Sequence, residues 1–287
     1  MSRPPILELP QGAHAHRLAT SRGPFAVHEM GSPTRGTALL IPGFTGSKED
    51  FVGLLEPLAH EGYRVVAVDG RGQYETGGPR EEGVYAQAEL AADVLAVAGA
   101  LRAEHSLHLV GHSLGGLVSR AAVFADRTPF TSLTLLSSGP GAVCTTQQSR
   151  LKMLLGALPV MDMEDVWRAM RELDPPEAAD ALTPPAVAEF LHHRWLANVP
   201  EQLIATARQL ITEPDRTEEL AALSADGIPL HVLSGERDYA WPVSTIDAMA
   251  AAAGARRTVI AGAEHSPNAE QPQQTAQALL TGWAAAL

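Results

Sequence analysis

The feature that most constrains the fold of this chain is a serine between two glycines at the junction of a strand and a helix. Leu107–Val110 is a short apolar run with strand composition, and it leads directly into Gly-His-Ser-Leu-Gly at residues 111–115. The alanine-containing segment Leu117–Asp126 that follows favours a helix. In so tight a turn, side chains at Gly111 and Gly115 would collide with neighbouring backbone. The strained turn lifts the serine hydroxyl into the open at the carboxyl end of a sheet.

The rest of the chain alternates strands and helices around this turn. Apolar runs with strand composition occupy Thr37–Ile41 and Arg64–Val68, and segments with helical periodicity follow them at Lys48–Gly62 and Ala86–Ala103. This order predicts a parallel sheet with crossover helices on both faces, which explains why the strands are apolar throughout. The other predicted elements are strands at Ser132–Leu136, Pro229–Leu233 and Thr258–Ala261, a closing helix at Ala269–Ala285, and an antiparallel hairpin of His14–Thr20 and Phe25–Met30.

One region, residues 143–223, interrupts the alternation because it contains no convincing strand. The proline pairs Pro175-Pro176 and Pro184-Pro185 punctuate it, and its pattern predicts four or five short helices. A helical block between two strands of one sheet is best interpreted as a cap over the edge of that sheet. We therefore expect an α/β core formed by residues 1–142 and 224–287, with a helical cap at 143–223 between its two parts.

A nucleophilic Ser113 needs a base, and the base needs a carboxylate to orient it. In a sheet of this kind they follow in the order serine, acid, histidine, each after a later strand. Of the 11 histidines, only His265 lies in a loop at the carboxyl end of a strand in this order. Asp238 is the expected acid because it is the farthest carboxylate along the loop after Pro229–Leu233, and Glu236 is the competing candidate.

The oxyanion that forms when the serine attacks a carbonyl needs two backbone amides. Leu114, directly after the serine, is expected to supply one of them. Phe44 is expected to supply the other, from the loop Pro42–Ser47 that follows the first parallel strand. The same loop also reads as a turn in which Ser47 caps the next helix, and both interpretations can hold together.

Apolar residues of the predicted cap are candidates for a substrate pocket above the serine. We expect Met161, Trp167 and Trp195 to contact substrate, together with His112 beside the nucleophile. Apolar residues at helical spacing are more often core residues than pocket residues, so a packing role competes with this hypothesis.

The charge balance limits the classes of partner. Lys and Arg number 21 against 33 Asp and Glu, which gives a formal net charge of −12. Such a surface repels phosphate backbones and anionic membranes, so we expect no nucleic-acid partner and no lipid-headgroup binding. The single cysteine, Cys144, excludes an intrachain disulfide and a cysteine-based zinc site. No secretion signal or membrane span is visible, so we expect a cytoplasmic monomer or homodimer that acts on a small molecule.

Taken together, these motifs resemble those of the α/β-hydrolase superfamily over essentially the whole chain. The resemblance implies an eight-stranded, mostly parallel sheet flanked by helices, and a serine-hydrolase triad with an oxyanion hole at the residues identified above. It implies no metal or organic cofactor. The motifs that carry it are residues 111–116, Pro42-Gly43-Phe44, Asp69-Gly70-Arg71-Gly72, Gly235-Glu236-Arg237-Asp238 and His265.

Two departures from the superfamily pattern bear on the substrate. Pro42-Gly43 stands where many members carry His-Gly, so the hydrogen bonding inside that loop must differ. Gln73-Tyr74-Glu75-Thr76 replaces the Gly-x-Ser that many members carry at positions shaping the mouth of the pocket. Haloalkane dehalogenases and epoxide hydrolases of this fold use an aspartate where this chain has Ser113, so the resemblance disfavours both activities.

The resemblance predicts a serine hydrolase that cleaves a carboxylic ester or lactone of small to medium, apolar character through an acyl-enzyme. A thioesterase, an amidase or a carbon–carbon bond hydrolase with the same triad is the alternative. A non-catalytic binding protein on the same fold is a further alternative. The complete set of Ser113, Asp238 and His265 argues against it, because only catalysis requires all three.

Overall fold

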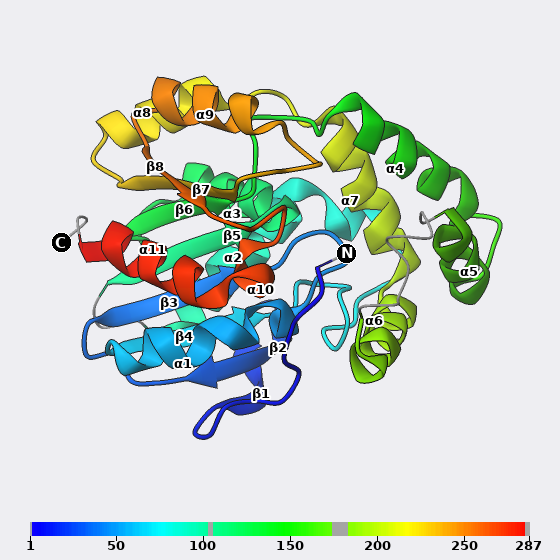
Figure 1. The fold of residues 1–287 in the computed structure, drawn as a ribbon, viewed down its shortest axis with the longest axis horizontal. Helices are drawn as coiled ribbons and strands as arrows, with labels where there is room; N and C mark the ends of the chain where they lie inside the picture. The colour runs from blue at the N-terminus through cyan, green and yellow to red at the C-terminus, as the bar shows by residue number, and fades with distance from the viewer. Residues whose placement is uncertain (1, 103–105, 174–182, 285–287) are drawn as a thin grey trace.

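The computed structural model describes residues 2–102, 106–173 and 183–284, and its central element is one sheet. The strands are β1 (His14–Thr20), β2 (Gly23–Met30), β3 (Gly36–Ile41), β4 (Tyr63–Val68), β5 (Leu107–His112), β6 (Ser132–Leu136), β7 (Leu230–Gly235) and β8 (Arg256–Ile260). In the described residues they form an eight-stranded sheet in the order β1-β2-β4-β3-β5-β6-β7-β8 (Figure 1). The β1–β2 and β2–β4 pairs are antiparallel and the others are parallel. The α/β class with an eight-stranded, mostly parallel sheet is thus confirmed.

Helices cover both faces of this sheet, as the alternating pattern predicts. Around it lie η1 (Lys48–Phe51), α1 (Val52–His60), η2 (Glu82–Tyr85), α2 (Gln87–Leu101), α3 (Leu114–Ala125), α9 (Val243–Ala252), α10 (Pro267–Glu270) and α11 (Pro272–Ala284). On one face lie α1 and α11 (Figure 1), and they bury Leu54 and Leu279. On the other, α2, α3 and α9 bury Val94, Leu117 and Ile246. No helix of the described residues is long and apolar enough to cross a membrane.

The inner strands are apolar for the reason that the sequence suggested. β3, β5 and β6 are buried along their whole length because helices cover both of their faces. β1 lies at one edge of the sheet, and most of its residues are exposed. The antiparallel hairpin of β1 and β2 therefore closes one edge without contributing to the parallel core.

Three helix boundaries differ from the prediction. The segment Lys48–Gly62 begins as the 3-10 helix η1 before it continues as α1. The helix after the serine begins at Leu114 and not at Leu117, because the chain passes from β5 into α3 through a single residue. The closing helix is divided into α10 and α11, and Pro272 occupies the first position of α11, where a missing N–H does no harm. Ala103, Pro175, Pro176 and Ala285 lie outside the described residues.

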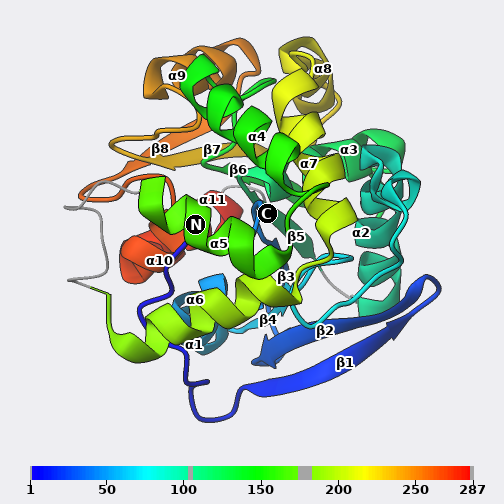
Figure 2. The same cartoon turned by 90° about the vertical axis from the view of Figure 1, so that its right-hand side faces the viewer.

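Between β6 and β7 the described chain is helical. Its helices are α4 (Thr145–Ala157), α5 (Met163–Leu173), α6 (Pro185–Ala197), α7 (Pro200–Thr212) and α8 (Thr217–Ala225). Figure 2 looks onto α4 to α7, which gather on one side of the sheet. Phe44, in the loop after β3, packs against a cluster of these helices, so the insertion contacts the carboxyl edge of the sheet. We call this cluster the insertion cluster; its buried members are Leu154, Leu158, Val166, Trp195, Leu203 and Ile204.

Candidate active site

Ser113 forms the turn between β5 and α3 by itself. Its backbone has φ +54° and ψ −119°, in a region that residues with a side chain rarely adopt. A Cβ at Gly111 would lie 2.3 Å from the carbonyl oxygen of Gly115, and a Cβ at Gly115 would lie 2.4 Å from the carbonyl oxygen of Ile41. Both contacts are with backbone atoms, which could move aside only at a large cost in free energy. The glycines are therefore required by the close approach of α3 to β3 and β5.

Three side chains from separate loops meet at this turn. The Oγ of Ser113 lies 3.0 Å from Nε2 of His265, which follows β8. Nδ1 of His265 lies 2.9 Å from each carboxylate oxygen of Asp238, which follows β7. The Asp238 side chain is fully buried and also accepts hydrogen bonds from the amides of Ala240 and Trp241. With Nδ1–H donating to the carboxylate, Nε2 is left to accept the serine proton.

The other carboxylates of these loops point elsewhere. Glu236 accepts a hydrogen bond from the Gly262 amide, and Glu264 forms an exposed ion pair with Arg237 at 2.8 Å. Asp238, and not its competitor Glu236, thus contacts His265. Among the described residues, no group of three or more His, Cys, Asp and Glu side chains could hold a metal ion.

The loop after β3 lies directly beside the serine. A Cβ at Gly43 would be 3.0 Å from the Cβ of Ser113, so only a glycine allows this approach without adjustment. Among the described residues, no hydrogen bond uses the backbone N–H of Phe44 or of Leu114. Both predicted oxyanion donors are therefore free to bind a ligand. Thr45, next in the loop, has φ +59°, a strained value for a residue with a branched side chain.

Gln73, which the sequence marked only as a departure near the mouth of the pocket, contacts this loop. The amide Nε2 of Gln73 donates to the carbonyl oxygen of Gly43 at 2.8 Å, and its Oε1 accepts from the amide of Gly70 at 3.2 Å. Gln73 is 5% exposed. The signal was present in the sequence as two separate departures from the superfamily pattern, at Pro42-Gly43 and at Gln73, and the structure connects them.

His112 lies behind the serine and contacts the backbone of the next loop. Its Nε2 is 2.8 Å from the carbonyl oxygen of His265, and its side chain is 3% exposed. Burial lowers the pKa of His112 to about 4, so the ring is neutral at pH 7 and donates its Nε2–H to that carbonyl. This contact helps to hold the loop that carries the His265 imidazole.

The three candidates from the insertion occupy different environments. Trp195 is completely buried in the insertion cluster and donates its indole N–H to the carbonyl of Met163 at 2.8 Å. Trp167 is half-buried and stacks on the ring of His192, with 5.2 Å between ring centroids. Met161 is 38% exposed in the turn between α4 and α5. Trp195 therefore packs the insertion together, as apolar residues at helical spacing usually do.

A buried ion pair ties the insertion to the loop beside the serine. Arg194 of α6 donates to Asp50 of η1 at 2.7 Å, and neither side chain is exposed. Arg194 also donates to the hydroxyl of Ser47 and to the carbonyl of Ser2. The carbonyl of Asp50 accepts a hydrogen bond from Asn268, just after the histidine loop. α6, the loop after β3 and the loop after β8 are thus joined at one point.

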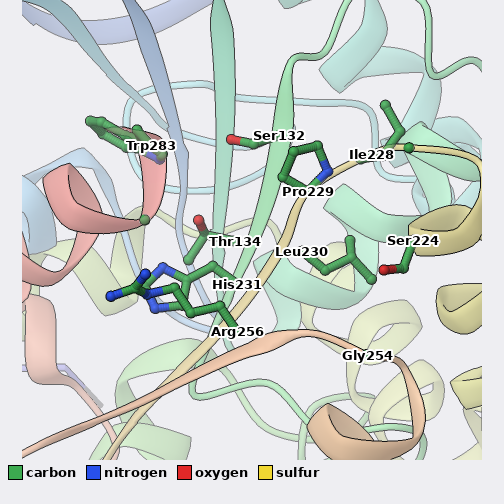
Figure 3. A pocket seen from close by; sticks show the side chains of 12 residues that line it. Ser132, Thr134, Ser224, Ile228, Pro229, Leu230, His231, Gly254, Arg256 and Trp283 are labelled. Atoms are coloured by element: carbon green, nitrogen blue, oxygen red, sulfur yellow. The ribbon is translucent and has the colours of Figure 1, made fainter. Parts of the chain in front are cut away.

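A cavity of about 330 Å³ lies away from this site, between the amino ends of β6 and β7 (Figure 3). Its wall includes Ser132 and His231, near the starts of those strands, and Trp283 of α11. Ser113 and Asp238 follow the carboxyl ends of their strands. A strand of five or six residues spans about 17–20 Å, so the cavity is separate from the candidate site.

Comparison with known proteins places the chain in a family. A family model described as the alpha/beta hydrolase family matches residues 38–278, which is most of the chain. The chain belongs to the alpha/beta hydrolase family. This hydrolase-family chain is also similar to the putative carbamate hydrolase RutD of Variovorax paradoxus (strain S110), with 35% identity over 112 residues. That match covers 39% of this chain and 41% of the relative, less than half of either.

Solved structures agree with the family assignment at the level of the fold. A thermophilic esterase from Thermogutta terrifontis superposes with a TM-score of 0.76 and 24% identity, covering 96% of this chain and 99% of that one. A hydrolase from Pseudomonas aeruginosa PA01 gives a TM-score of 0.74 and 24% identity, covering 94% of this chain and 98% of that one. At this level of identity the likeness establishes the shared fold of the alpha/beta hydrolases.

Proposed function

We propose that this chain is a serine hydrolase in which Ser113 is the nucleophile, His265 the general base and Asp238 the orienting acid. The observation that carries the proposal is the continuous series of contacts from the Ser113 hydroxyl through both nitrogens of His265 to the buried Asp238 carboxylate. The strained backbone at Ser113 adds support, because strain of this kind accumulates at functional sites.

The proposed reaction begins with proton transfer from the Ser113 hydroxyl to Nε2 of His265, as the serine oxygen attacks a carbonyl carbon. The Asp238 carboxylate stabilises the imidazolium that forms. The negative oxygen of the tetrahedral intermediate accepts hydrogen bonds from the Phe44 and Leu114 amides. His265 returns the proton to the leaving group, which departs and leaves an acyl-enzyme. Water then repeats the sequence and releases the acid.

A carboxylic ester or lactone of small to medium, apolar character is the proposed substrate class. Residues 143–223 are proposed to cap the core formed by 1–142 and 224–287, with Trp167 and Met161 the insertion residues favoured for substrate contact because neither is fully buried. The contact between Phe44 and the insertion cluster supports this arrangement, since it brings the cap beside the proposed oxyanion donor. Esters suit the site because their leaving groups need little assistance beyond one proton.

A carbamate or amide is the second candidate substrate. The observation that favours it is the similarity to the putative carbamate hydrolase RutD over 112 residues. A carbamate carbonyl can be attacked by the same serine and held by the same amides. Its nitrogen leaving group depends more strongly on protonation by His265, so the two classes respond differently to loss of the Asp238 carboxylate.

The test compares wild type, Ser113→Ala and Ser149→Ala on p-nitrophenyl esters from acetate to laurate and on an alkyl N-(4-nitrophenyl)carbamate, whose nitrogen leaving group is 4-nitroaniline. Ser149 is an exposed residue of α4 and serves as the matched control. We expect turnover by wild type and Ser149→Ala, and loss of nearly all turnover in Ser113→Ala. Labelling by a fluorophosphonate should follow the same pattern. Hydrolysis by Ser113→Ala at the wild-type rate would contradict the proposal.

A further inference from the structure

Gln73 is placed to control the orientation of one proposed oxyanion donor. It lies in the turn after β4, outside the series of contacts that links Ser113, His265 and Asp238. Its amide Nε2 donates to the carbonyl oxygen of Gly43 at 2.8 Å, and this bond is buried. The effect of this hydrogen bond depends on its acceptor, the Gly43 carbonyl.

The carbonyl of Gly43 and the N–H of Phe44 belong to the same peptide group. This group is planar and trans, so its C=O and N–H point in opposite directions and rotate only together. A hydrogen bond that fixes the Gly43 carbonyl therefore fixes the direction of the Phe44 N–H. The donation also polarises the peptide, which strengthens the N–H as a donor.

The loop needs such a restraint because it is strained. Thr45, directly after Phe44, has φ +59°, a strained conformation that persists only where surrounding contacts impose it. One restraint lies inside the loop, since the amide of Gly46 also donates to the Gly43 carbonyl, at 3.0 Å. Gln73 supplies the restraint from outside.

Gln73 is itself held rigidly. Its Oε1 accepts from the amide of Gly70, and a Cβ at Gly70 would lie 2.3 Å from that oxygen, so the side chain fits only beside a glycine. The turn is fixed at its other end as well, because Asp69 accepts from the Glu75 amide and Thr76 accepts from the amide of Ala26. Because Gln73 is held at the end of β4, its hydrogen bond to Gly43 fixes the loop after β3 relative to β4.

We infer that Gln73 is a positioning residue for the oxyanion hole, acting through the single peptide group that joins Gly43 to Phe44. This inference rests on the proposed function. It also explains how the chain manages without the His-Gly of many relatives: a side chain from the turn after β4 supplies a hydrogen bond to the loop.

The test uses Gln73→Met, which keeps the length of the side chain and removes the donor, and Gln73→Glu, which places acceptor oxygens against the Gly43 carbonyl. Gln209→Met is the matched control, because the Gln209 amide likewise donates to a backbone carbonyl, that of Tyr85 at 2.7 Å, in a half-buried setting away from the serine. All variants are compared with wild type on the ester that wild type hydrolyses fastest.

We expect kcat to fall about 10- to 100-fold in Gln73→Met, less than the loss on removing an oxyanion donor outright, and further in Gln73→Glu. KM should change less than threefold, because the ground state uses the donors less than the transition state does. Affinity for an alkyl boronic acid, which forms a tetrahedral adduct with the serine, should fall in parallel with kcat. Gln209→Met should keep kcat and boronate affinity within twofold of wild type, even with an equal loss of stability.

Two measurements separate the failure of this inference from failure of the proposed function. A kcat within twofold of wild type in Gln73→Met, with serine-dependent turnover intact, would overturn the inference alone. If wild type shows no serine-dependent turnover, the backbone amide of Phe44 still reports by NMR. A changed chemical shift of that amide in Gln73→Met, but not in Gln209→Met, would support the positioning role. An unchanged Phe44 amide would refute it.

Discussion

The buried ion pair between Arg194 and Asp50 makes a quantitative prediction about stability. The two charges are 2.7 Å apart, and neither side chain is exposed. Replacing Arg194 with methionine preserves most of the volume and leaves the Asp50 carboxylate buried. Among the described residues, the remaining donor to that carboxylate is the amide of Ser47 at 3.2 Å. A buried charge left without its partner costs about 3–5 kcal/mol.

Urea unfolding followed by tryptophan fluorescence measures this loss. With a slope of about 2–3 kcal/mol per molar urea, Arg194→Met should lower the midpoint by about 1–2 M. Arg208→Met is the matched control, since Arg208 pairs with Glu82 where both side chains are exposed, at 60% and 40%. Loss of such a surface pair should lower the free energy of unfolding by less than about 1 kcal/mol.

The double variant Arg194→Met, Asp50→Asn distinguishes an uncompensated charge from a simple loss of packing. Removing the carboxylate together with its cation should recover part of the stability, because the buried charge is then absent. The reasoning is refuted if Arg194→Met loses less than about 1 kcal/mol. A double variant whose loss equals the sum of the two single losses would refute it as well.

Three further outcomes follow from the same structure. Gly115→Ala should prevent folding, since its Cβ would lie 2.4 Å from a backbone oxygen of β3. In Gly99→Ala, in α2, the added Cβ meets nothing within 4 Å, so this variant should raise the free energy of unfolding by about 0.5–1 kcal/mol. Soluble yield and thermal melts measure both outcomes. Asp238→Asn should keep the circular dichroism spectrum and lower kcat by up to about 10⁴-fold in the ester assay. Burial lowers the pKa of His108 and of His231 to about 4, so the unfolded chain takes up protons first as pH falls below 6.5. Each of these two histidines should then lower the free energy of unfolding by about 2 kcal/mol between pH 7 and pH 5. The urea midpoint of His108→Gln should therefore fall less over that interval than the midpoint of wild type.

Features with a local signal could be predicted from the sequence. The glycines around Ser113 predict the tight turn between a strand and a helix. The short, wholly apolar runs predict strands that are covered on both faces of a sheet. The order serine, acid, histidine then directed attention to the loops that contain Asp238 and His265. The structure brings these three side chains within hydrogen-bonding distance.

Features that depend on contacts across the sequence could not be predicted in this way. Gln73 contacts a residue 30 positions earlier, and Arg194 contacts one 144 positions earlier. The sequence marked Gln73 only as a departure near the mouth of the pocket, and nothing in the pattern around Arg194 indicated a buried partner. Trp195 and Trp167 have the same helical spacing signature, and only the packing of α5 against α6 shows that one is buried and the other half-exposed.

The loop beside Ser113 is held from two directions, and this limits how substrate can reach the serine. Gln73 fixes the loop from β4, and Arg194 fixes it from α6 through Asp50. If α6 swung away from the core, it would break the buried ion pair at a cost of about 3–5 kcal/mol, so the opened state would hold less than about 1% of the molecules. α4 carries no such anchor among the described residues, and Met153 on it is 57% exposed. Entry of substrate on the side of α4 leaves both restraints on the Phe44 peptide intact, whereas entry that displaces α6 would disturb the proposed oxyanion hole each time a substrate binds.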